Sequence, residues 1–356
     1  MKKENRKELS GIKEIARRAN VSIATVDRVL HNRTGVSPKT KELIEGLIKE
    51  LNYQPNLLAR NLALKNNLNF AFLIPSVSRE SDFWNAPLKG LQLAESELLQ
   101  QGVKVSHFFF DLEDKSSFVS QYRQVLKLQP DGVVLAPSFI AESREFVKQC
   151  RKKRIPYVFI NSDIPEEDSL CYIGPELYRS GYQGGRLVSY ITRKQDKIMV
   201  VNISKEIDAH HHLLRKEEGF RAYFTEKKLP NPIVRLDIHH TGYASVKKEF
   251  LAALKKHKDI KAVFVTNSRV VTVADIVEKQ EIKNLVLVGY DLVTGTSDFL
   301  KQQLISFLIC QRPQEQGYRS IMTLYNQLML GIAPPEKSLY MPIDIVTPEN
   351  YEFYRN

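Results

Sequence analysis

Short apolar runs alternate with amphipathic stretches along the chain from residue 68 onward. The runs are rich in Val, Ile, Leu and Phe, which is typical of strands buried on both faces. The candidate strands are 70–74, 103–110, 132–136, 157–160, 198–201, 233–236, 262–265, 285–288 and 304–309. Strands that alternate with helices predict parallel sheets covered on both faces. This many strands favours two α/β lobes that meet around a cleft.

The length of 356 residues predicts two or three domains. No apolar run approaches the roughly 18 residues of a membrane span, and the N-terminal segment lacks the apolar region of a secretory signal. We therefore expect a cytoplasmic protein. Cys150, Cys171 and Cys310 lie far apart without metal or disulfide spacing, so we expect buried thiols.

Positive charge is concentrated at the start of the chain. Residues 1–66 carry 14 Lys and Arg against 7 Asp and Glu, a balance of +7 out of the total of +11. The other 290 residues carry +4. A basic N-terminal segment favours a nucleic-acid partner if a suitable structural motif accompanies it.

The first fifty residues predict three short helices around a small core. Apolar residues at Ile12, Ile15, Ala16 and Ala19 have helical spacing and predict a helix over 12–19. Ser22 and Ser37 are placed to cap the two helices that follow, the third of which opens with Pro38. The second helix exposes small or hydrogen-bonding side chains that suit base edges and phosphates: Ala24, Thr25, Asp27, Arg28 and His31.

This segment, continued through NYQPNLLARNLALK, resembles the headpiece of the lactose-repressor family of bacterial transcription regulators. The resemblance implies a second helix in the major groove and a hinge helix that places a leucine in the minor groove. Our candidate DNA-binding residues are Ser22, Ile23, Ala24, Thr25, Arg28, His31, Ser37, Asn56, Ala59 and Leu62.

Asp27 departs from the family pattern, which has Ser or Thr at this position. Because phosphate repels a carboxylate, we consider three roles for Asp27: it orients Arg28, contacts a cytosine amino group, or lies away from the DNA backbone. The sequence leaves these three open.

In open parallel sheets, ligands bind beyond the carboxyl ends of the strands. Amides, carboxylates and aromatic rings follow several of the predicted strands, and that combination suits a polyol such as a sugar. Our candidate ligand-binding residues are Ser76, Phe83, Trp84, Asn161, Asp163, Arg215, Asn267, Asp291 and Gln311.

The region after residue 67 resembles the periplasmic-binding-protein type I fold, the sensory core of the same regulator family. VGYD ending at Asp291 and ICQRP around Gln311 match it best. Lys216 stands where the family has an arginine, so either Arg215 or Lys216 supplies the cation. Asn161 and Ser162 replace an Asp-Arg pair of some pentose binders, so the ligand is not transferable from them.

These patterns predict a small all-α helix-turn-helix headpiece followed by a doubly wound α/β core of two lobes. The expected divisions are a headpiece over 1–54, a hinge helix and linker over 55–67, and a core over 68–356. The first lobe is expected at about 68–164 and 310–332, and the second at about 165–309 and 333–356.

Two patterns have competing interpretations. His210, His211 and His212 lack a partner with metal-ligand spacing, so a hydrogen bond to ligand is favoured over a metal. Gly181, Gly184 and Gly185 fit close helix packing better than a phosphate cradle. No nucleophile elbow, HExxH or Walker motif is present, so we expect neither an enzyme nor a cofactor.

The sequence thus predicts a transcription regulator that binds a pseudo-palindromic operator as a homodimer and senses a sugar. We expect this regulator to be a repressor. The alternatives are a periplasmic-type solute receptor, a carbohydrate-active enzyme, and a regulator that senses a nucleobase or a sugar phosphate. The sequence does not indicate whether ligand releases or promotes DNA binding.

Overall fold

The computed structural model describes residues 11–30, 34–51, 53, 67–78, 82–164, 166–205, 207 and 211–355. The chain divides into two compact units, Met1–Lys65 and Asn66–Asn356. Most of the predicted hinge helix and linker, residues 55–66, lies outside the described residues. No described helix is both long and apolar enough to traverse a bilayer. The three cysteines are buried free thiols, as expected.

The first unit contains the three predicted helices, α1 (Ile12–Ala19), α2 (Ile23–Leu30) and α3 (Pro38–Glu50). Pro38 opens α3, and Ser37 caps it by accepting a hydrogen bond from the backbone N–H of Thr40 at 3.2 Å. Ser22 accepts in the same way from the N–H of Thr25 at 3.2 Å. The apolar faces of the three helices form one small core, which confirms the three-helix unit predicted from the apolar spacing.

The first lobe of the second unit is built on a parallel sheet of six strands. In order across the sheet they are β11 (Ser338–Tyr340), β5 (Cys171–Gly174), β4 (Tyr157–Ile160), β3 (Gly132–Leu135), β1 (Leu68–Pro75) and β2 (Val103–Phe110). Its helices are η1 (Asp82–Trp84), α5 (Asn85–Leu98), η2 (Leu99–Gln101), α6 (Lys115–Leu128), α7 (Ile140–Lys152), α13 (Pro313–Tyr325) and η4 (Asn326–Leu330).

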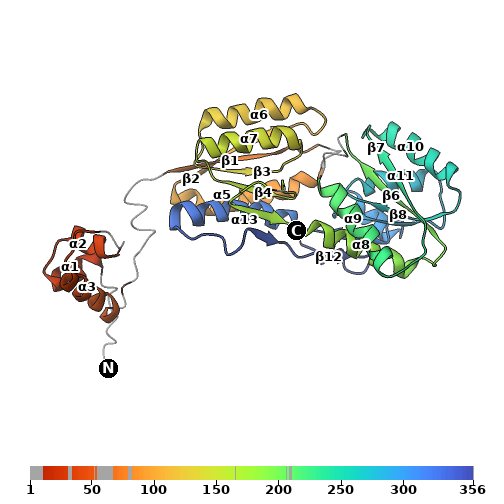
Figure 1. Cartoon of the computed structure of the whole chain (residues 1–356). Helices are drawn as coiled ribbons and strands as arrows, with labels where there is room; N and C mark the ends of the chain where they lie inside the picture. Colours follow the sequence, from red (N-terminus) through yellow and green to blue (C-terminus); the bar gives the residue numbers. More distant parts are fainter. Residues whose placement is uncertain are drawn as a thin grey trace, which may run out of the picture. The chain divides into compact units, whose positions relative to one another are not determined.

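Side chains along β1 alternate between the two faces of this sheet. Phe70 and Phe72 pack in the core that contains residues of α5 and α13. Ala71 and Leu73 pack in the core formed with α6 and α7. Figure 1 shows α6 and α7 above the sheet and α5 and α13 below it. Both faces are therefore covered, which explains the almost continuous apolar sequence of β1.

The second lobe repeats this architecture. Its strands, in order across the sheet, are β12 (Asp344–Val346), β10 (Phe307–Cys310), β9 (Val286–Tyr290), β8 (Ile260–Val265), β6 (Lys197–Ile203) and β7 (Ile233–Ile238). They are parallel except for β12, which runs antiparallel to β10. Its helices are α8 (Leu177–Ile191), α9 (His211–Glu226), α10 (Tyr243–Lys256), α11 (Val270–Lys279) and α12 (Thr296–Lys301).

The two-lobed α/β fold class is confirmed, and each of the nine predicted strands is present with ends shifted by a few residues. The lobe divisions differ from those expected. β5 pairs with β4 and β11 pairs with β5, so both belong to the first sheet and not to the second lobe. Strands of three or four residues carry too little periodicity to reveal their partners. In the described core the chain passes between the lobes at 175–176, 311–312 and 341–343.

Glycines allow α8 and α9 to approach closely. A Cβ at Gly181 would lie 1.9 Å from the carbonyl oxygen of Lys216, and a Cβ at Gly219 would lie 1.9 Å from that of Tyr178. Gly185 similarly faces the carbonyl of Phe220. The glycines of α8 therefore serve helix packing, as the sequence favoured over a phosphate cradle.

We predict that Gly181→Ala destabilises the core. Alanine raises helix propensity by about 1 kcal/mol, but relieving the backbone clash should cost more, leaving a net loss of about 1–3 kcal/mol. Urea unfolding followed by circular dichroism measures this. Arg179→Ala, an exposed position on the same helix, should change the free energy of unfolding by less than about 0.5 kcal/mol. Equal effects of the two substitutions would contradict the packing argument.

Candidate functional site

The first unit presents one face of α2 to solvent. Ser22, Ala24 and Arg28 are exposed, and the Ile23 side chain is 45% exposed although it is apolar. Thr25 is half-buried. Exposed small and cationic side chains at the start of a second helix suit a DNA groove. Ser37 is exposed at the start of α3, whereas the remaining DNA candidates lie outside the described residues: His31, Asn56, Ala59 and Leu62.

Asp27 is half-buried in α2. The pKa of the Tyr53 phenol is raised, first by burial and second by the negative charge of Asp27. Asp27 is thus less exposed than Arg28, and its three possible roles stay predictions.

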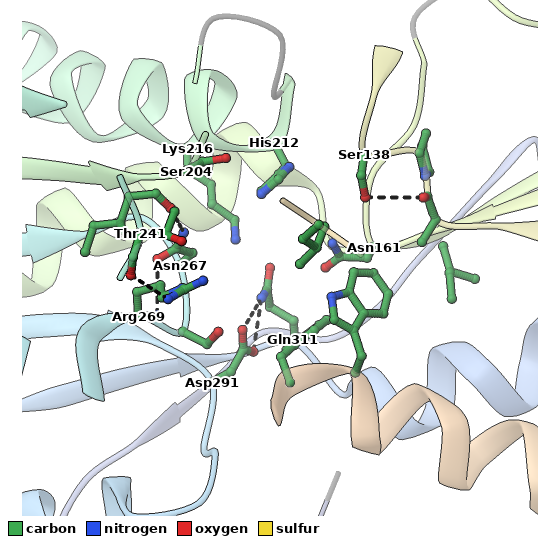
Figure 2. Close-up of a pocket in the computed structure, with 18 of the residues that line it drawn as sticks. Ser138, Asn161, Ser204, His212, Lys216, Thr241, Asn267, Arg269, Asp291 and Gln311 are labelled. Carbon is green, nitrogen blue, oxygen red and sulfur yellow. Dashed lines mark hydrogen bonds between the residues drawn. The ribbon is translucent and has the colours of Figure 1, made fainter. Parts of the chain in front are cut away.

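A cavity of about 100 Å³ lies between the two lobes of the second unit (Figure 2). Six of the nine candidate ligand-binding residues line it: Phe83, Trp84, Asn161, Asn267, Asp291 and Gln311. Asn161 directly follows β4, Asp291 follows β9 and Gln311 follows β10. The cavity therefore lies at the carboxyl ends of the strands, where parallel sheets bind ligands.

Two of these lining residues, Asn161 and Asp291, have a left-handed backbone conformation that suits their side chains. Asn161 has φ +66° and Asp291 has φ +63°, and both turn the chain at the end of a strand. Asn and Asp tolerate this left-handed conformation better than other non-glycine residues. Each side chain thus has a local structural role as well as a place in the cavity.

Asp291 and Gln311 form the floor of the cavity (Figure 2). The Nε2 of Gln311 donates to both carboxylate oxygens of Asp291 at 3.0 Å. The Gln311 Oε1 is buried, and within the described residues it has no hydrogen-bond partner. A ligand hydroxyl could donate to this oxygen and offset the cost of burying it.

Lys216 on α9 faces Asp291 across the cavity. Its side chain lies 3.7 Å from the centre of the Tyr290 ring, and the residue is 3% exposed. Burial lowers the pKa of Lys216 to about 8, and the charge of Asp291 opposes that shift. Burial raises the pKa of Asp291 to about 6, against the opposing effects of Lys216 and Gln311.

The structure therefore places Lys216 in the cavity and Arg215 outside it. Arg215 forms an ion pair with Glu218, and its guanidinium lies 5.1 Å from the centre of the Tyr178 ring. The sequence could not choose between the two cations, because their order along a helix does not say which face packs against the sheet.

Two further candidates do not line the cavity. Ser76 follows β1, and its hydroxyl donates to the carbonyl oxygen of Phe110 at 3.0 Å, at the end of β2. Asp163 Oδ1 lies 3.2 Å from Nδ1 of His211 on α9, where the two form an ion pair only when the imidazole is protonated. Ser76 therefore joins two strand ends, and Asp163 lies beside α9 of the second lobe.

Of the remaining lining residues, the sequence offered Lys216 as the alternative to Arg215 and His212 as a possible hydrogen-bond partner of the ligand. The others were not considered: Leu112, Glu113, Ala136, Pro137, Ser138, Ile160, Ile203, Ser204, Thr241, Ser268 and Arg269. Several of them, including Glu113, Ser138 and Thr241, stand two or three residues beyond a strand, so a wider window at each strand end would have found them. The tertiary structure decides which of the described histidines lines the cavity, which is His212 and not His211. Within the described residues, no group of three His, Cys, Asp or Glu is arranged to hold a metal, and His210 lies outside them.

Contacts across the cleft hold the lobes together. The Thr241 hydroxyl donates to the Glu113 carboxylate at 2.6 Å, and the N–H of Thr294 donates to Asp82 at 2.9 Å. At the hinge, Gln316 is fully buried, and its amide donates to the carbonyl of Gln311 at 2.8 Å. Its Oε1 accepts from the N–H of Asn161 at 2.9 Å. These bonds join strand ends of the two sheets.

Family models match both units. Residues 70–331 match the periplasmic binding protein domain, and residues 11–56 match the lacI family of bacterial regulatory proteins. The chain is 27% identical over 294 residues to the ribose operon repressor of Halalkalibacterium halodurans, covering 80% of each protein. It is 29% identical over 239 residues to catabolite control protein A of Staphylococcus epidermidis, covering 66% of this chain and 67% of that protein.

Solved structures share the fold of the core. A Bacteroides fragilis structure described as a LacI transcriptional regulator superposes with a TM-score of 0.77 at 27% identity, covering 82% of this chain and all of that one. A solute-binding protein of Burkholderia graminis, solved in complex with D-arabinose, gives a TM-score of 0.73 at 18% identity, covering 82% of this chain and 99% of that one.

The raised pKa of Asp291 predicts a pH-dependent stability. The folded protein retains the proton to about pH 6, whereas the ordinary pKa is 3.8. The free energy of unfolding should therefore fall as pH rises from about 4 to about 6, by at most about 1.4 kcal/mol per pH unit from this group. Asp291→Asn should remove that component in urea unfolding series across this range.

Asp259→Asn is the control, because the pKa of the exposed Asp259 is lowered by Lys197 and not raised. Asp259→Asn should leave the fall in the free energy of unfolding between about pH 4 and about pH 6 in place. If this fall is unchanged in Asp291→Asn, its assignment to the Asp291 carboxyl is wrong.

Proposed function

This chain belongs to the lacI family of bacterial regulatory proteins, with a periplasmic binding protein domain as its core, and we propose that it is a sugar-sensing repressor of the cytoplasm. The observation that carries the proposal is the combination in one chain of a helix-turn-helix unit and a polar cleft at strand ends. Its relatives are transcription regulators, and we propose no enzymatic activity.

The operator is proposed to be pseudo-palindromic and bound by a homodimer. One α2 helix presents Ile23, Ala24 and Arg28 to a single half-site. Short recognition helices of this type read DNA in pairs related by a two-fold axis, one per half-site. The net charge of +7 over residues 1–66 supplies attraction to phosphates that does not depend on sequence.

The effector is proposed to be a monosaccharide. Asp291, Asn267 and the Oε1 of Gln311, which has no hydrogen-bond partner among the described residues, offer acceptors for hydroxyls, and Lys216 offers a donor. Trp84 and Phe83 form an aromatic wall with ring centres 5.1 Å apart. A relative is named for the ribose operon, and a solved structure of the same fold holds D-arabinose.

Ligand and DNA are proposed to be coupled through closure of the cleft. A ligand shifts the arrangement of the lobes only if it binds one arrangement more tightly than the other. It would contact residues of both lobes beside the Thr241 to Glu113 hydrogen bond and the Gln316 hinge amide. A solute-binding receptor shares this core, but the recognition helix unit favours the regulator.

We predict that Arg28→Ala weakens operator binding. Loss of a cationic contact to base or phosphate should cost about 1–3 kcal/mol, or roughly tenfold to a hundredfold in affinity. An operator selected from random DNA with the unaltered chain, followed by fluorescence anisotropy, provides the measurement. Arg179→Ala removes an equal charge from the core and should leave affinity unchanged. Unchanged affinity in Arg28→Ala would overturn the assignment of α2.

We predict opposite outcomes for two adjacent cations. Lys216→Met removes the buried charge beside Asp291 and should weaken effector binding by about tenfold or more, since a hydrogen bond to a charged group is worth about 1.5–3 kcal/mol. Arg215→Met removes a neighbouring charge outside the cavity and should have little effect. Calorimetry with sugars found by a thermal-shift screen measures both affinities. A larger loss of affinity in Arg215→Met than in Lys216→Met would contradict the placement of the ligand beside Lys216.

A further inference from the structure

Two buried side chains of the first lobe hold segments of the chain that connect the lobes. Tyr172 of β5 is 5% exposed, and Gln316 of α13 is fully buried. Neither residue lines the cavity, but both bind the backbone of Asn161, which does. The connecting segments of the described core are 175–176, 311–312 and 341–343.

The Gln316 amide joins one connecting segment to Asn161. Its Nε2 donates to the carbonyl oxygen of Gln311 at 2.8 Å, where the chain leaves the second lobe. Its Oε1 accepts from the N–H of Asn161 at 2.9 Å. Both of its partners line the cavity. Because one planar amide makes both bonds, movement of one partner must displace the other or lengthen a hydrogen bond.

The Tyr172 phenol forms a similar link at another connecting segment. Its hydroxyl lies 2.9 Å from the carbonyl oxygen of Pro175 and 3.3 Å from that of Asn161. Burial raises the pKa of Tyr172 well above its ordinary value, so the hydroxyl remains a donor. A Cβ at Gly174 would lie 2.3 Å from this hydroxyl oxygen, so the glycine leaves room for the phenol at the strand end.

Asn161 therefore stands between the ligand site and the hinge. The residue lines the cavity, as Figure 2 shows. Its N–H and its carbonyl oxygen meet the two side chains that reach two of the three connecting segments. When lobes rotate, a few residues at such connections take up most of the change in backbone angles. Hydrogen bonds made at these segments can therefore carry a change of lobe arrangement to Asn161.

We propose that Gln316 and Tyr172 are positioning residues, through which a ligand bound at Asn161 sets the arrangement of the two lobes. This inference rests on the proposed function as a ligand-responsive regulator, and it names the residues that couple the site to the hinge. Because neither residue lines the cavity, their substitution should reduce the response of operator binding to ligand more than the affinity for ligand.

Operator affinity with and without sugar measures this response. Fluorescence anisotropy uses the full chain, an operator selected from random DNA, and saturating D-ribose, D-arabinose, D-glucose or D-galactose. Gln316→Met keeps the length of the side chain but removes both hydrogen bonds, and Tyr172→Phe removes only the hydroxyl. Each should bring the ratio of the two operator affinities closer to one by about threefold to tenfold, the usual worth of a hydrogen bond.

Two matched substitutions serve as controls and should leave this ratio unchanged. Tyr157→Phe removes the hydroxyl of another buried tyrosine, whose oxygen has no hydrogen-bond partner within the described residues. Gln124→Met replaces an exposed glutamine of α6. A ratio unaltered in both Gln316→Met and Tyr172→Phe would overturn the proposal.

A double substitution separates positioning from a general weakening of the fold. Asn161→Gly suits the φ of +66° and keeps the backbone N–H and carbonyl, but it removes the side chain at the cavity. If Gln316 acts through Asn161, Gln316→Met should have little further effect on the ratio in the Asn161→Gly background. Independent effects of the two substitutions would contradict the role of Gln316.

A measurement without ligand separates this inference from the proposed function. Trp84 is the only tryptophan of the chain, lines the cavity and is 6% exposed, so acrylamide quenching of its fluorescence reports opening of the cleft. Gln316→Met and Tyr172→Phe should each raise the quenching constant, whereas Tyr157→Phe should not. If no sugar alters operator binding by the unaltered chain, the proposed function fails and quenching decides the inference. A constant unchanged in both variants overturns it.

Discussion

The parallel arrangement of the strands is the constraint on which the rest of the core depends. Parallel strands need crossover helices, and those helices place every carboxyl end at one edge of the sheet. Because two such sheets face each other, residues far apart in sequence, such as Asn161 and Asp291, line one cavity. Their left-handed conformations turn the chain away from the sheet at this edge. Strand topology thus builds the cleft before any ligand chemistry is considered.

Burial of opposite charges gives the cleft its electrostatic character. Asp291 and Lys216 are both almost inaccessible to water, so each shifts toward its neutral form while the other opposes that shift. The position of Lys216 depends on helix packing, because its carbonyl oxygen lies against Gly181 of α8. The close approach of α8 and α9 and the charge within the cavity are therefore one structural feature.

Local patterns predicted much of the molecule. The first headpiece helix spans the residues that apolar spacing predicted, and the second and third begin directly after Ser22 and Ser37 as predicted, because a capping residue marks the start of a helix in its own sequence. The nine apolar runs were equally visible, including the four-residue strands β3 and β4. The segments of β5 and β11 were not predicted as strands and fell within the expected second lobe, because their place in the first sheet depends on pairing with β4 and with each other.

The sequence by itself determined the fold class, the headpiece and the strand-end residues Asn161, Asn267, Asp291 and Gln311 that line the cavity. Tertiary structure decided which side chains beyond them enter it. One step along an α-helix rotates a side chain by about 100°, so Lys216 faces the cleft while Arg215 faces Glu218. Likewise, Ser76 and Asp163 follow strands, but the Ser76 hydroxyl donates to Phe110 and the Asp163 carboxylate lies against His211. Packing of a whole helix or loop settles such choices, and no short window of sequence contains it.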